Sequence, residues 1–153
     1  MMKIGVSFDI HQTFDTNCLF AILKCLKEEN YNWYVIDNQT EVWADSDGKE
    51  VFSKKEYNSE EFFELISDKH YAVFVKIQAY FVSSGFYEVH TKEEFKNSDC
   101  RIIVLICDSF WGDIYIKDIS MIDNVYQSLL KGGFDNVKYI YDNEAKRTKL
   151  DVL

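Results

Sequence analysis

Six consecutive apolar residues, Ile102–Cys107, constrain the fold of this 153-residue chain more than any other segment. Successive side chains of a β-strand point to opposite faces of its sheet, so such a run needs cover on both faces, or on one face with tight neighbours. We therefore predict a central strand over 101–108. No apolar run in the chain exceeds six residues, whereas a membrane-spanning helix requires roughly 20.

The rest of the chain alternates between strand and helix patterns. The predicted strands are connected largely in pairs by short turns, and such pairs are antiparallel neighbours. Strands are predicted at 2–8, 32–36, 41–44, 51–52, 71–82, 86–90, 101–108, 114–117, 137–141 and 148–152. The length is that of one domain. The sequence thus predicts a single α+β domain over 1–153, with a mostly antiparallel sheet and about four helices packed on it.

Capping signals position these helices. A helical pattern begins at Thr13 and is expected to end near Asn30. Residues 58–61 (Asn-Ser-Glu-Glu) and 91–94 (Thr-Lys-Glu-Glu) are two capping boxes, in which side chains at both ends of the motif satisfy free backbone N–H groups. Ser120 is the expected N-cap of the last helix, whose apolar stripe includes Leu129. Gly132-Gly133 is expected to end that helix.

Charge and composition exclude several classes of function. The chain has 17 Lys and Arg residues against 26 Asp and Glu residues, so its net charge is −9. Nucleic-acid-binding proteins need a basic face, and no run of the sequence supplies one. Asp9 interrupts the first apolar stretch, so a signal peptide is not expected. We predict a cytoplasmic protein with no membrane contact, whose protein partner has a basic surface.

The cysteines and the Asp-rich turn do not indicate a metal site. Cys18/Cys25 and Cys100/Cys107 are each seven residues apart, which suits neither a local disulfide nor zinc, so buried free thiols are predicted. Residues 45–48 (Asp-Ser-Asp-Gly) resemble a calcium loop, but Trp43 and Lys54 would occupy its first and last ligand positions. No metal or cofactor is expected.

Two groups of residues are candidates for chemistry. Asp9 and His11 are two residues apart on a predicted strand, as are Glu88 and His90, so each carboxylate and imidazole share a face. Such a pair suits a general base, and adjacent strands would bring both pairs into one catalytic or metal site. The alternative is that both histidines simply lie at strand ends.

Asp108-Ser109 with Asp113 is the second group, because the exit of a central strand often lines a binding cleft. Trp111 would add an aromatic contact. The alternative is a hairpin whose Asp and Ser satisfy backbone groups of the turn.

Several short sequence motifs give the chain a family resemblance. They are residues 4–8 (Ile-Gly-Val-Ser-Phe), 32–34 (Asn-Trp-Tyr), 97–100 (Asn-Ser-Asp-Cys) running into 102–109, and Asp142 with 147–150 (Arg-Thr-Lys-Leu). The chain resembles a family of uncharacterised proteins from Bacillus and related Firmicutes, the domain of unknown function 2691. The resemblance implies a stand-alone bacterial protein and carries no activity.

These observations favour a non-catalytic, acidic, cytoplasmic module that binds another protein. The nucleophile elbow, the Walker loop and the zinc-protease motif are all missing from the sequence. Aromatic residues make up 16% of the chain, and exposed Tyr and Trp favour interfaces. The alternative is a small hydrolase-type or ligand-binding enzyme that uses Asp9/His11 or Asp108.

Overall fold

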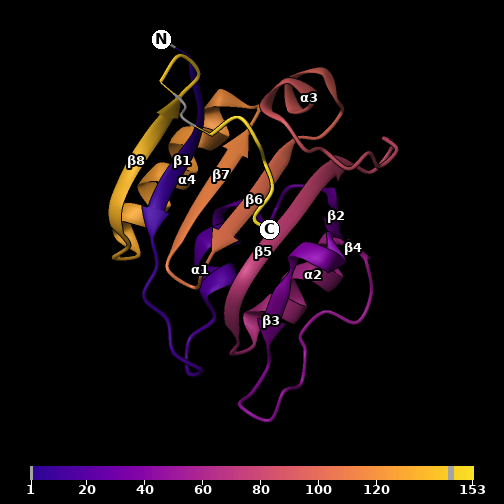
Figure 1. Cartoon of the computed structure of the whole chain (residues 1–153), viewed down its shortest axis with the longest axis vertical. Helices are drawn as coiled ribbons and strands as arrows, with labels where there is room; N and C mark the ends of the chain where they lie inside the picture. Colours follow the sequence, from indigo (N-terminus) through magenta and orange to yellow (C-terminus); the bar gives the residue numbers. More distant parts are fainter. Residues whose placement is uncertain (1, 145–146) are drawn as a thin grey trace.

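The computed structural model describes residues 2–144 and 147–153, which are built around one large antiparallel sheet (Figure 1). The sheet contains β1 (Lys3–Asp9), β2 (Tyr31–Val35), β3 (Glu41–Trp43), β4 (Glu56–Asn58), β5 (Tyr71–Phe81), β6 (Ile102–Cys107), β7 (Trp111–Ile116) and β8 (Asp135–Tyr141). Seven of them lie in the order β4-β2-β5-β6-β7-β1-β8, while β3 pairs with β5 outside this path, and every strand pair is antiparallel. The predicted α+β class is confirmed.

Strands β2 and β3 follow one another along the same edge of β5. β2 pairs with residues 77–81 of β5, and β3 pairs with residues 71–74. The short 3-10 helix η2 (Asp37–Gln39) lies between them. This interruption of the edge places Gln39 where it contacts the last residues of the chain.

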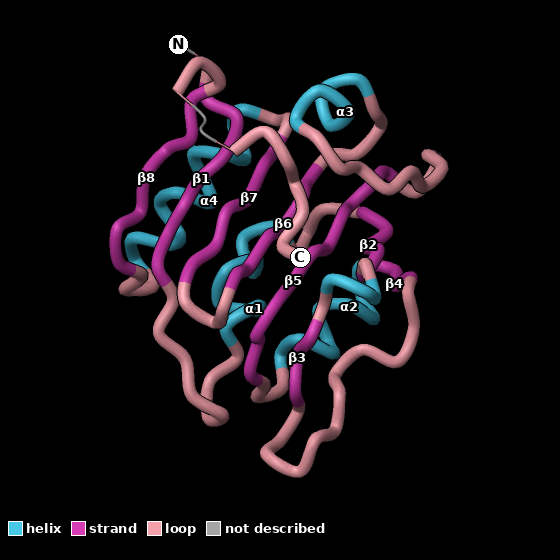
Figure 2. The backbone as a smooth tube through the Cα atoms, viewed as in Figure 1, coloured by secondary structure: helices cyan, strands magenta, loops and turns pink. Residues whose placement is uncertain are grey.

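Three helices cover one face of the sheet, here called the back face. They are α1 (Cys18–Leu23), which continues into the 3-10 helix η1 (Lys24–Leu26), α2 (Ser59–Ser67) and α4 (Ile119–Lys131). Figure 2 shows α1 and α4 behind the strands. The larger core forms here, where the rings of Trp33 and Phe62 stack with centroids 4.5 Å apart. Leu129 of α4 is fully buried in the same core.

The opposite, front face carries a smaller core. It is covered by α3 (Lys92–Asn97) and by residues 147–153, the C-terminal segment, which crosses in front of the sheet (Figure 1). Phe95 and Leu150 pack on Ile103 and Leu105 of β6. All six residues of β6 are buried, so the prediction of a central strand covered on both faces is confirmed.

The capping box before α2 forms as predicted, whereas only the Thr91 half of the one before α3 forms, because the Glu94 carboxylate accepts from the Thr91 hydroxyl and not from the Thr91 N–H. The Asn58 side chain accepts from the Glu61 backbone N–H, and the Glu61 side chain accepts from the Asn58 N–H. Thr91 caps α3 by accepting from the Glu94 N–H. The prediction for α4 was wrong, because Asp118 and not Ser120 is the N-cap and its carboxylate accepts from the Ser120 and Met121 N–H groups.

Four predicted elements differ in the structure. Residues 51–52 are not a strand: an isolated bridge joins Glu50 to Trp43, and the next strand is β4 at Glu56–Asn58. The first helix is short, and a 3-10 turn ends it at Leu26 and not near Asn30. Residues 86–90 are not a strand, because their backbone groups hydrogen-bond to side chains on the front face of β5 and not to a neighbouring strand. Gln78 accepts from the Val89 N–H, and the Tyr80 hydroxyl bonds to the Tyr87 backbone. Residues 148–152 form no strand with β8 either. They lie over the front face, where the Leu150 N–H donates to the His90 carbonyl.

All four cysteines lie within the described residues and are free thiols, three of them buried and Cys25 exposed. Burial raises the pKa of Cys18 and of Cys100 to about 12. Within the described part of the chain, no helix is long and apolar enough to cross a bilayer.

A reducing agent is expected to leave the melting temperature of freshly purified protein unchanged. None of the four thiols is paired, so no covalent cross-link limits the unfolded chain. Thermal unfolding with and without dithiothreitol measures this. A decrease of several degrees with the thiol present would reveal a disulfide and contradict the prediction.

Candidate functional site

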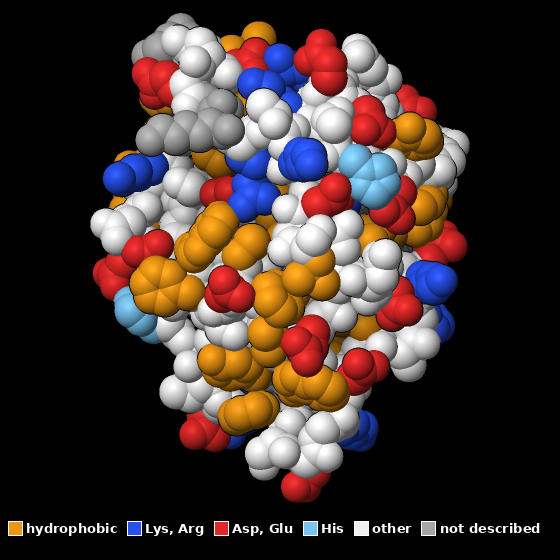
Figure 3. All heavy atoms as spheres, in the orientation of Figure 1, with side chains coloured by type: hydrophobic (Ala, Val, Ile, Leu, Met, Phe, Trp, Pro, Cys, Tyr) orange, Lys and Arg blue, Asp and Glu red, His pale blue; other side chains and the backbone are white. Residues whose placement is uncertain are grey.

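Four aromatic side chains gather at the end of the sheet where β6 finishes and β5 and β7 begin. Phe14 and Tyr71 stack with ring centroids 5.1 Å apart, and Phe110 and Trp111 follow the β6–β7 turn. The exposed fractions of Phe14, Phe110 and Trp111 are 42%, 53% and 37%. Figure 3 shows hydrophobic side chains gathered across the middle and lower part of the front face. We call these four residues the aromatic cluster.

The side chain of Gln12 ties together the segments that carry the cluster. Its amide nitrogen donates to the backbone carbonyls of Ala72 (2.6 Å) and Ser109 (3.1 Å), and its oxygen accepts from the Ala72 N–H (3.0 Å). The Ile10 N–H also donates to the Phe110 carbonyl. The loop before α1, the start of β5 and the β6–β7 turn are thereby held as one unit.

The β6–β7 turn is unusual because two consecutive residues other than glycine have left-handed backbones. The φ angles of Asp108 and Ser109 are 52° and 59°. The Phe110 N–H donates to the Cys107 carbonyl, and the Ser109 N–H donates to the Val73 carbonyl of β5. Positive φ costs free energy for such residues and persists only where the surrounding structure imposes it. The hairpin given as the alternative does form, but backbone bonds and not the Asp108 and Ser109 side chains hold its turn, which presents Asp108 and Phe110.

The structure brings all four candidate residues to this end of the sheet. Asp9 and Trp111 are register partners on β1 and β7, and Asp108 lies in the adjoining turn. The predicted contact between Asp9 and His11 is nevertheless wrong. His11 Nε2 lies 2.7 Å from a carboxylate oxygen of Asp135, and Asp9 accepts from the Asn136 side chain at 2.5 Å. An irregularity in the β1–β8 pairing at Ser7/Asp9 lies beside these contacts.

The second predicted pair does form, at a different place. His90 Nε2 lies 3.1 Å from a carboxylate oxygen of Glu88, and both residues lie over the front face near β5. His90 then contacts Asp151, whereas His11 contacts Asp135, so the two histidines do not build one site. Within residues 2–144 and 147–153, no group of three or more His, Cys, Asp or Glu side chains is arranged to hold a metal ion.

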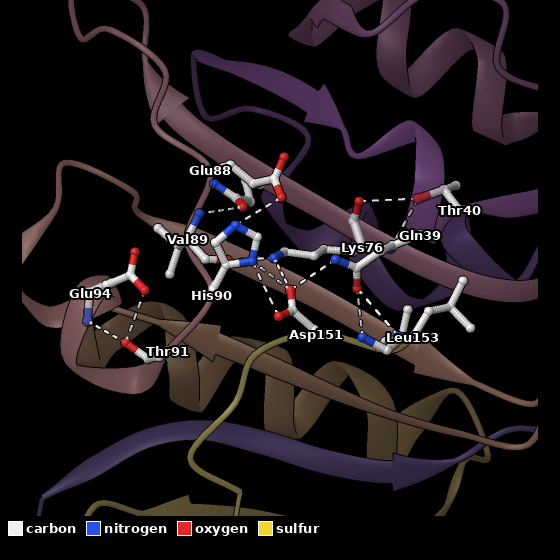
Figure 4. A network of polar contacts seen from close by, with 12 residues as sticks. Gln39, Thr40, Lys76, Glu88, Val89, His90, Thr91, Glu94, Asp151 and Leu153 are labelled. Atoms are coloured by element: carbon white, nitrogen blue, oxygen red, sulfur yellow. Dashed lines mark hydrogen bonds and ion pairs between the residues drawn. The ribbon is translucent and has the colours of Figure 1, made fainter.

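A buried ion pair holds the C-terminal segment on the sheet (Figure 4). Lys76, in the middle of β5, is fully buried, and its Nζ lies 2.5 Å from a carboxylate oxygen of Asp151. The same carboxylate accepts from Gln39 at 2.9 Å and contacts His90 at 3.1 Å. Partial burial raises the pKa of Asp151, but hydrogen bonds from Lys76, Gln39 and His90 outweigh this and lower it overall. Lys76 also donates to the Val89 carbonyl.

The C-terminal segment also supports Trp111. Arg147 Nε lies 3.2 Å from a carboxylate oxygen of Asp113, and its guanidinium carbon lies 5.3 Å from the centre of the Trp111 ring. Burial raises the pKa of Asp113 although Arg147 opposes the shift. A groove beside Trp111 runs over Ser7, Asp113 and Lys138. The aromatic cluster is therefore braced from the front by Arg147.

Four residues that hold these segments together, Gln12, Gln39, Lys76 and Asp151, were not predicted as site residues from the sequence. One signal was present in β5, where Lys76 and Gln78 interrupt an otherwise apolar strand at alternate positions and therefore share a face. Asp151, the acidic partner of Lys76, is 75 residues away along the chain, and Gln39 is 112 residues away from the same carboxylate. No local pattern could identify these contacts, because they join residues far apart in the sequence.

His70 was also missed, and it fixes the start of α1. It is fully buried, its Nδ1 bonds to the Asp68 carbonyl at 2.8 Å, and its Nε2 accepts from the Leu19 N–H at 3.1 Å. A carbonyl only accepts and an N–H only donates, so the ring is the neutral tautomer with its proton on Nδ1. Burial lowers the pKa of His70 below 6.5.

The free energy of unfolding is expected to fall as pH is lowered through about 6.5. The unfolded state takes up a proton on His70 before the folded state does, so the slope reaches at most about 1.4 kcal/mol per pH unit for this group. Urea unfolding between pH 7.5 and 5.5 measures it. His70→Gln should flatten this slope, whereas the matched variant of an exposed histidine, His11→Gln, should retain it. Equal slopes in both variants would contradict this role.

The chain matches a known protein family. The family model described as "Protein of unknown function (DUF2691)" matches residues 3–151, from the first strand to the carboxylate that pairs with Lys76. This chain belongs to the DUF2691 family. The resemblance drawn from its short sequence words is confirmed.

One relative in this family is a protein from Bacillus subtilis (strain 168), named uncharacterized protein YncE. It is 32% identical over 154 residues, which cover 99% of this chain and 100% of the relative. No solved structure gives a significant match. The DUF2691 match therefore establishes a bacterial family that covers nearly the whole chain and carries no assigned activity.

Proposed function

We propose that this DUF2691 protein is a non-catalytic cytoplasmic module that binds another protein through its aromatic cluster. The observation that carries the proposal is the clustering of Phe14, Tyr71, Phe110 and Trp111 at one end of the sheet, with Phe14, Phe110 and Trp111 exposed. Exposed aromatic side chains of this kind form the energetic centre of many protein interfaces.

The cluster is held in a defined arrangement before any partner binds. Gln12 fixes the three backbone segments, Arg147 lies against Trp111, and the left-handed turn at Asp108 and Ser109 sets the direction of Phe110. A preorganised surface loses less conformational entropy on binding than a mobile one. This rigidity supports a recognition role for the strained turn.

Charge indicates the chemistry of the partner. Asp9, Asp15 and Asp108 lie on the same segments as the aromatic side chains, and the whole chain carries −9. A negative field steers positively charged surfaces toward it and repels nucleic acid. The proposed occupant is therefore a protein with an apolar recess inside a basic rim.

The competing proposal of a small hydrolase-type enzyme finds less support in the geometry. His11 pairs with Asp135, and these side chains are 70% and 61% exposed. Asp9 accepts from an amide and not from His11, and Asp108 lies in the turn. A general base is usually tuned by burial as well as by a neighbouring charge, and this exposed pair lacks the burial.

The test is affinity capture from the native host with a matched pair of variants. Phe14→Ser/Phe110→Ser removes two side chains that are 42% and 53% exposed, whereas the control Phe81→Ser/Tyr87→Ser removes two that are 47% and 58% exposed elsewhere. We expect the wild type and the control to capture the same partner protein. The amount captured by the cluster variant should be at least about tenfold lower. Circular dichroism verifies that both variants are folded.

Binding of the captured, purified protein should weaken as salt is raised, because screening shortens the range of the acidic field to about 8 Å at physiological salt. Equal capture by all three proteins would remove the aromatic cluster from the interface. Affinity that stays constant from low to high salt would overturn the basic character of the partner.

A further inference from the structure

A pocket with an apolar floor lies at the opposite end of the sheet from the aromatic cluster. It is found beside α3, where β1 begins and β7 ends (Figure 1). Its volume is about 410 Å³, which is in the range of small-molecule sites. Its floor and rim contain Met2, Ile4, Phe95, Ile116 and Ile119. Met2 and Ile119 are 61% and 56% exposed, so apolar surface remains open to water here.

Lysines from two distant parts of the chain border this apolar surface. Lys92 and Lys96 of α3 share the Asp142 carboxylate, at 3.2 and 2.7 Å. Lys117 donates to the Ser98 carbonyl, and its Nζ lies 5.2 Å from the centre of the Phe95 ring.

The positive charges at the pocket exceed the negative ones. Lys3 also lines it, but its ammonium group is paired with Asp123 at 3.0 Å. Among the described lining residues, Asp142 is the one acid, and its carboxylate pairs with Lys92 and Lys96 but not with Lys117, which bonds to the Ser98 carbonyl. In a chain of net charge −9, this is a local reversal of sign.

We propose that this pocket binds an amphipathic anion: a single-chain carboxylate whose hydrocarbon covers the apolar floor and whose head group lies among the three lysines. The floor supplies apolar contact, and the ammonium groups supply charge-assisted hydrogen bonds. Burial lowers the pKa of Lys117, so its ammonium group gains from a nearby anion. The three lysines that border the pocket are sufficient to bind the head group.

Ligands with only one of these two properties fit less well. Inorganic phosphate is anionic, but it would leave the surface of Ile119, Met2 and Phe95 in contact with water. A neutral alcohol would cover that surface, but it would leave the ammonium groups without a new partner. The combination of both properties is therefore what the pocket selects.

The experiment is a titration with decanoate, decan-1-ol and inorganic phosphate, followed by calorimetry and by amide NMR shifts. We expect decanoate to bind with a Kd below about 1 mM, to shift the amides of Phe95 and Ile119, and to bind more weakly as salt rises. Lys92→Gln/Lys96→Gln should weaken binding at least about fivefold. The control Lys24→Gln/Lys27→Gln, which removes the same charge from an exposed site, should leave the affinity unchanged.

Ile119→Ser tests the floor separately. This side chain is exposed, so the variant is expected to fold. It should weaken the binding of decanoate without changing the charge of the pocket. The proposal is overturned if decanoate does not bind at 5 mM, a concentration about five times the expected Kd. Equal binding of decan-1-ol or phosphate, or equal affinity of the two lysine double variants, would also overturn it. Protein capture by the aromatic cluster is independent of each of these outcomes.

Discussion

Asp151→Asn is expected to lower the free energy of unfolding by about 3 kcal/mol, because it leaves a buried ammonium group without its counter-charge. Lys76 is fully buried, and its Nζ lies 2.5 Å from the Asp151 carboxylate. The substitution preserves the size of the side chain but removes the charge that Gln39 and His90 also contact. Urea unfolding at neutral pH, compared by midpoint at unchanged slope, measures the loss.

Two further variants separate the ion pair from general damage. Lys76→Met/Asp151→Asn should recover most of the stability, because an apolar side chain at a buried position needs no counter-charge. Asp123→Asn breaks the ion pair with Lys3, in which the Lys3 and Asp123 side chains are 30% and 48% exposed. This variant should cost less than about 1 kcal/mol of unfolding free energy. A loss in Asp151→Asn no larger than in Asp123→Asn would show that water replaces the carboxylate at little cost.

Leu129→Ala is expected to cost about 2–5 kcal/mol, the usual range for emptying a core position. Leu129 is fully buried where α4 packs on the back face of the sheet. The loss combines the transfer of the removed side-chain atoms with the cavity that they leave. Chemical denaturation measures it.

The neighbouring residue provides a matched control for this prediction. Leu130 is 46% exposed on the same helix, so Leu130→Ala changes the same chemistry outside the core and should cost less than about 0.5 kcal/mol. If the two substitutions cost the same, Leu129 does not face the core and the orientation of α4 is wrong. A loss below about 1 kcal/mol in Leu129→Ala would lead to the same conclusion.

The two proposed binding surfaces lie at opposite ends of one sheet and differ in charge. The aromatic cluster carries acidic neighbours such as Asp9 and Asp108, whereas the pocket beside α3 is bordered by Lys92, Lys96 and Lys117. The C-terminal segment lies between them on the front face and contacts Trp111 through Arg147. Variants at one end therefore serve as controls for binding at the other.

Elements whose cause is local were predictable from the sequence. β6 required cover on both faces because six apolar residues follow one another, and α4 required a buried stripe because its apolar residues recur at helical spacing. The capping box at Asn58 and the N-cap at Thr91 depend on residues only three positions apart. The start of α4 was misplaced by two residues, since Asp118 and Ser120 are both good caps and Asp118 bonds to the Ser120 N–H.

The candidate site was predictable only in part. Asp9, Asp108 and Trp111 do reach one end of the sheet, because strand ends of antiparallel neighbours meet there. The partner of His11 was not predictable, since Asp135 is 124 residues away and lies at the start of a different strand. Segments 86–90 and 148–152 have strand-like sequences, yet they lie over the sheet because side chains of β5 and η2 bond to their backbones.

The sequence alone determined the fold class, the central strand, the N-caps of α2 and α3 and the family, because each depends on short-range patterns of polarity and capping. The tertiary structure decided the order of the strands, the pairing of Lys76 with Asp151 and the meeting of Lys92, Lys96 and Lys117 around an apolar pocket. These contacts join residues far apart in the chain. Their free energy depends on burial and on counter-charges that only the folded sheet brings together.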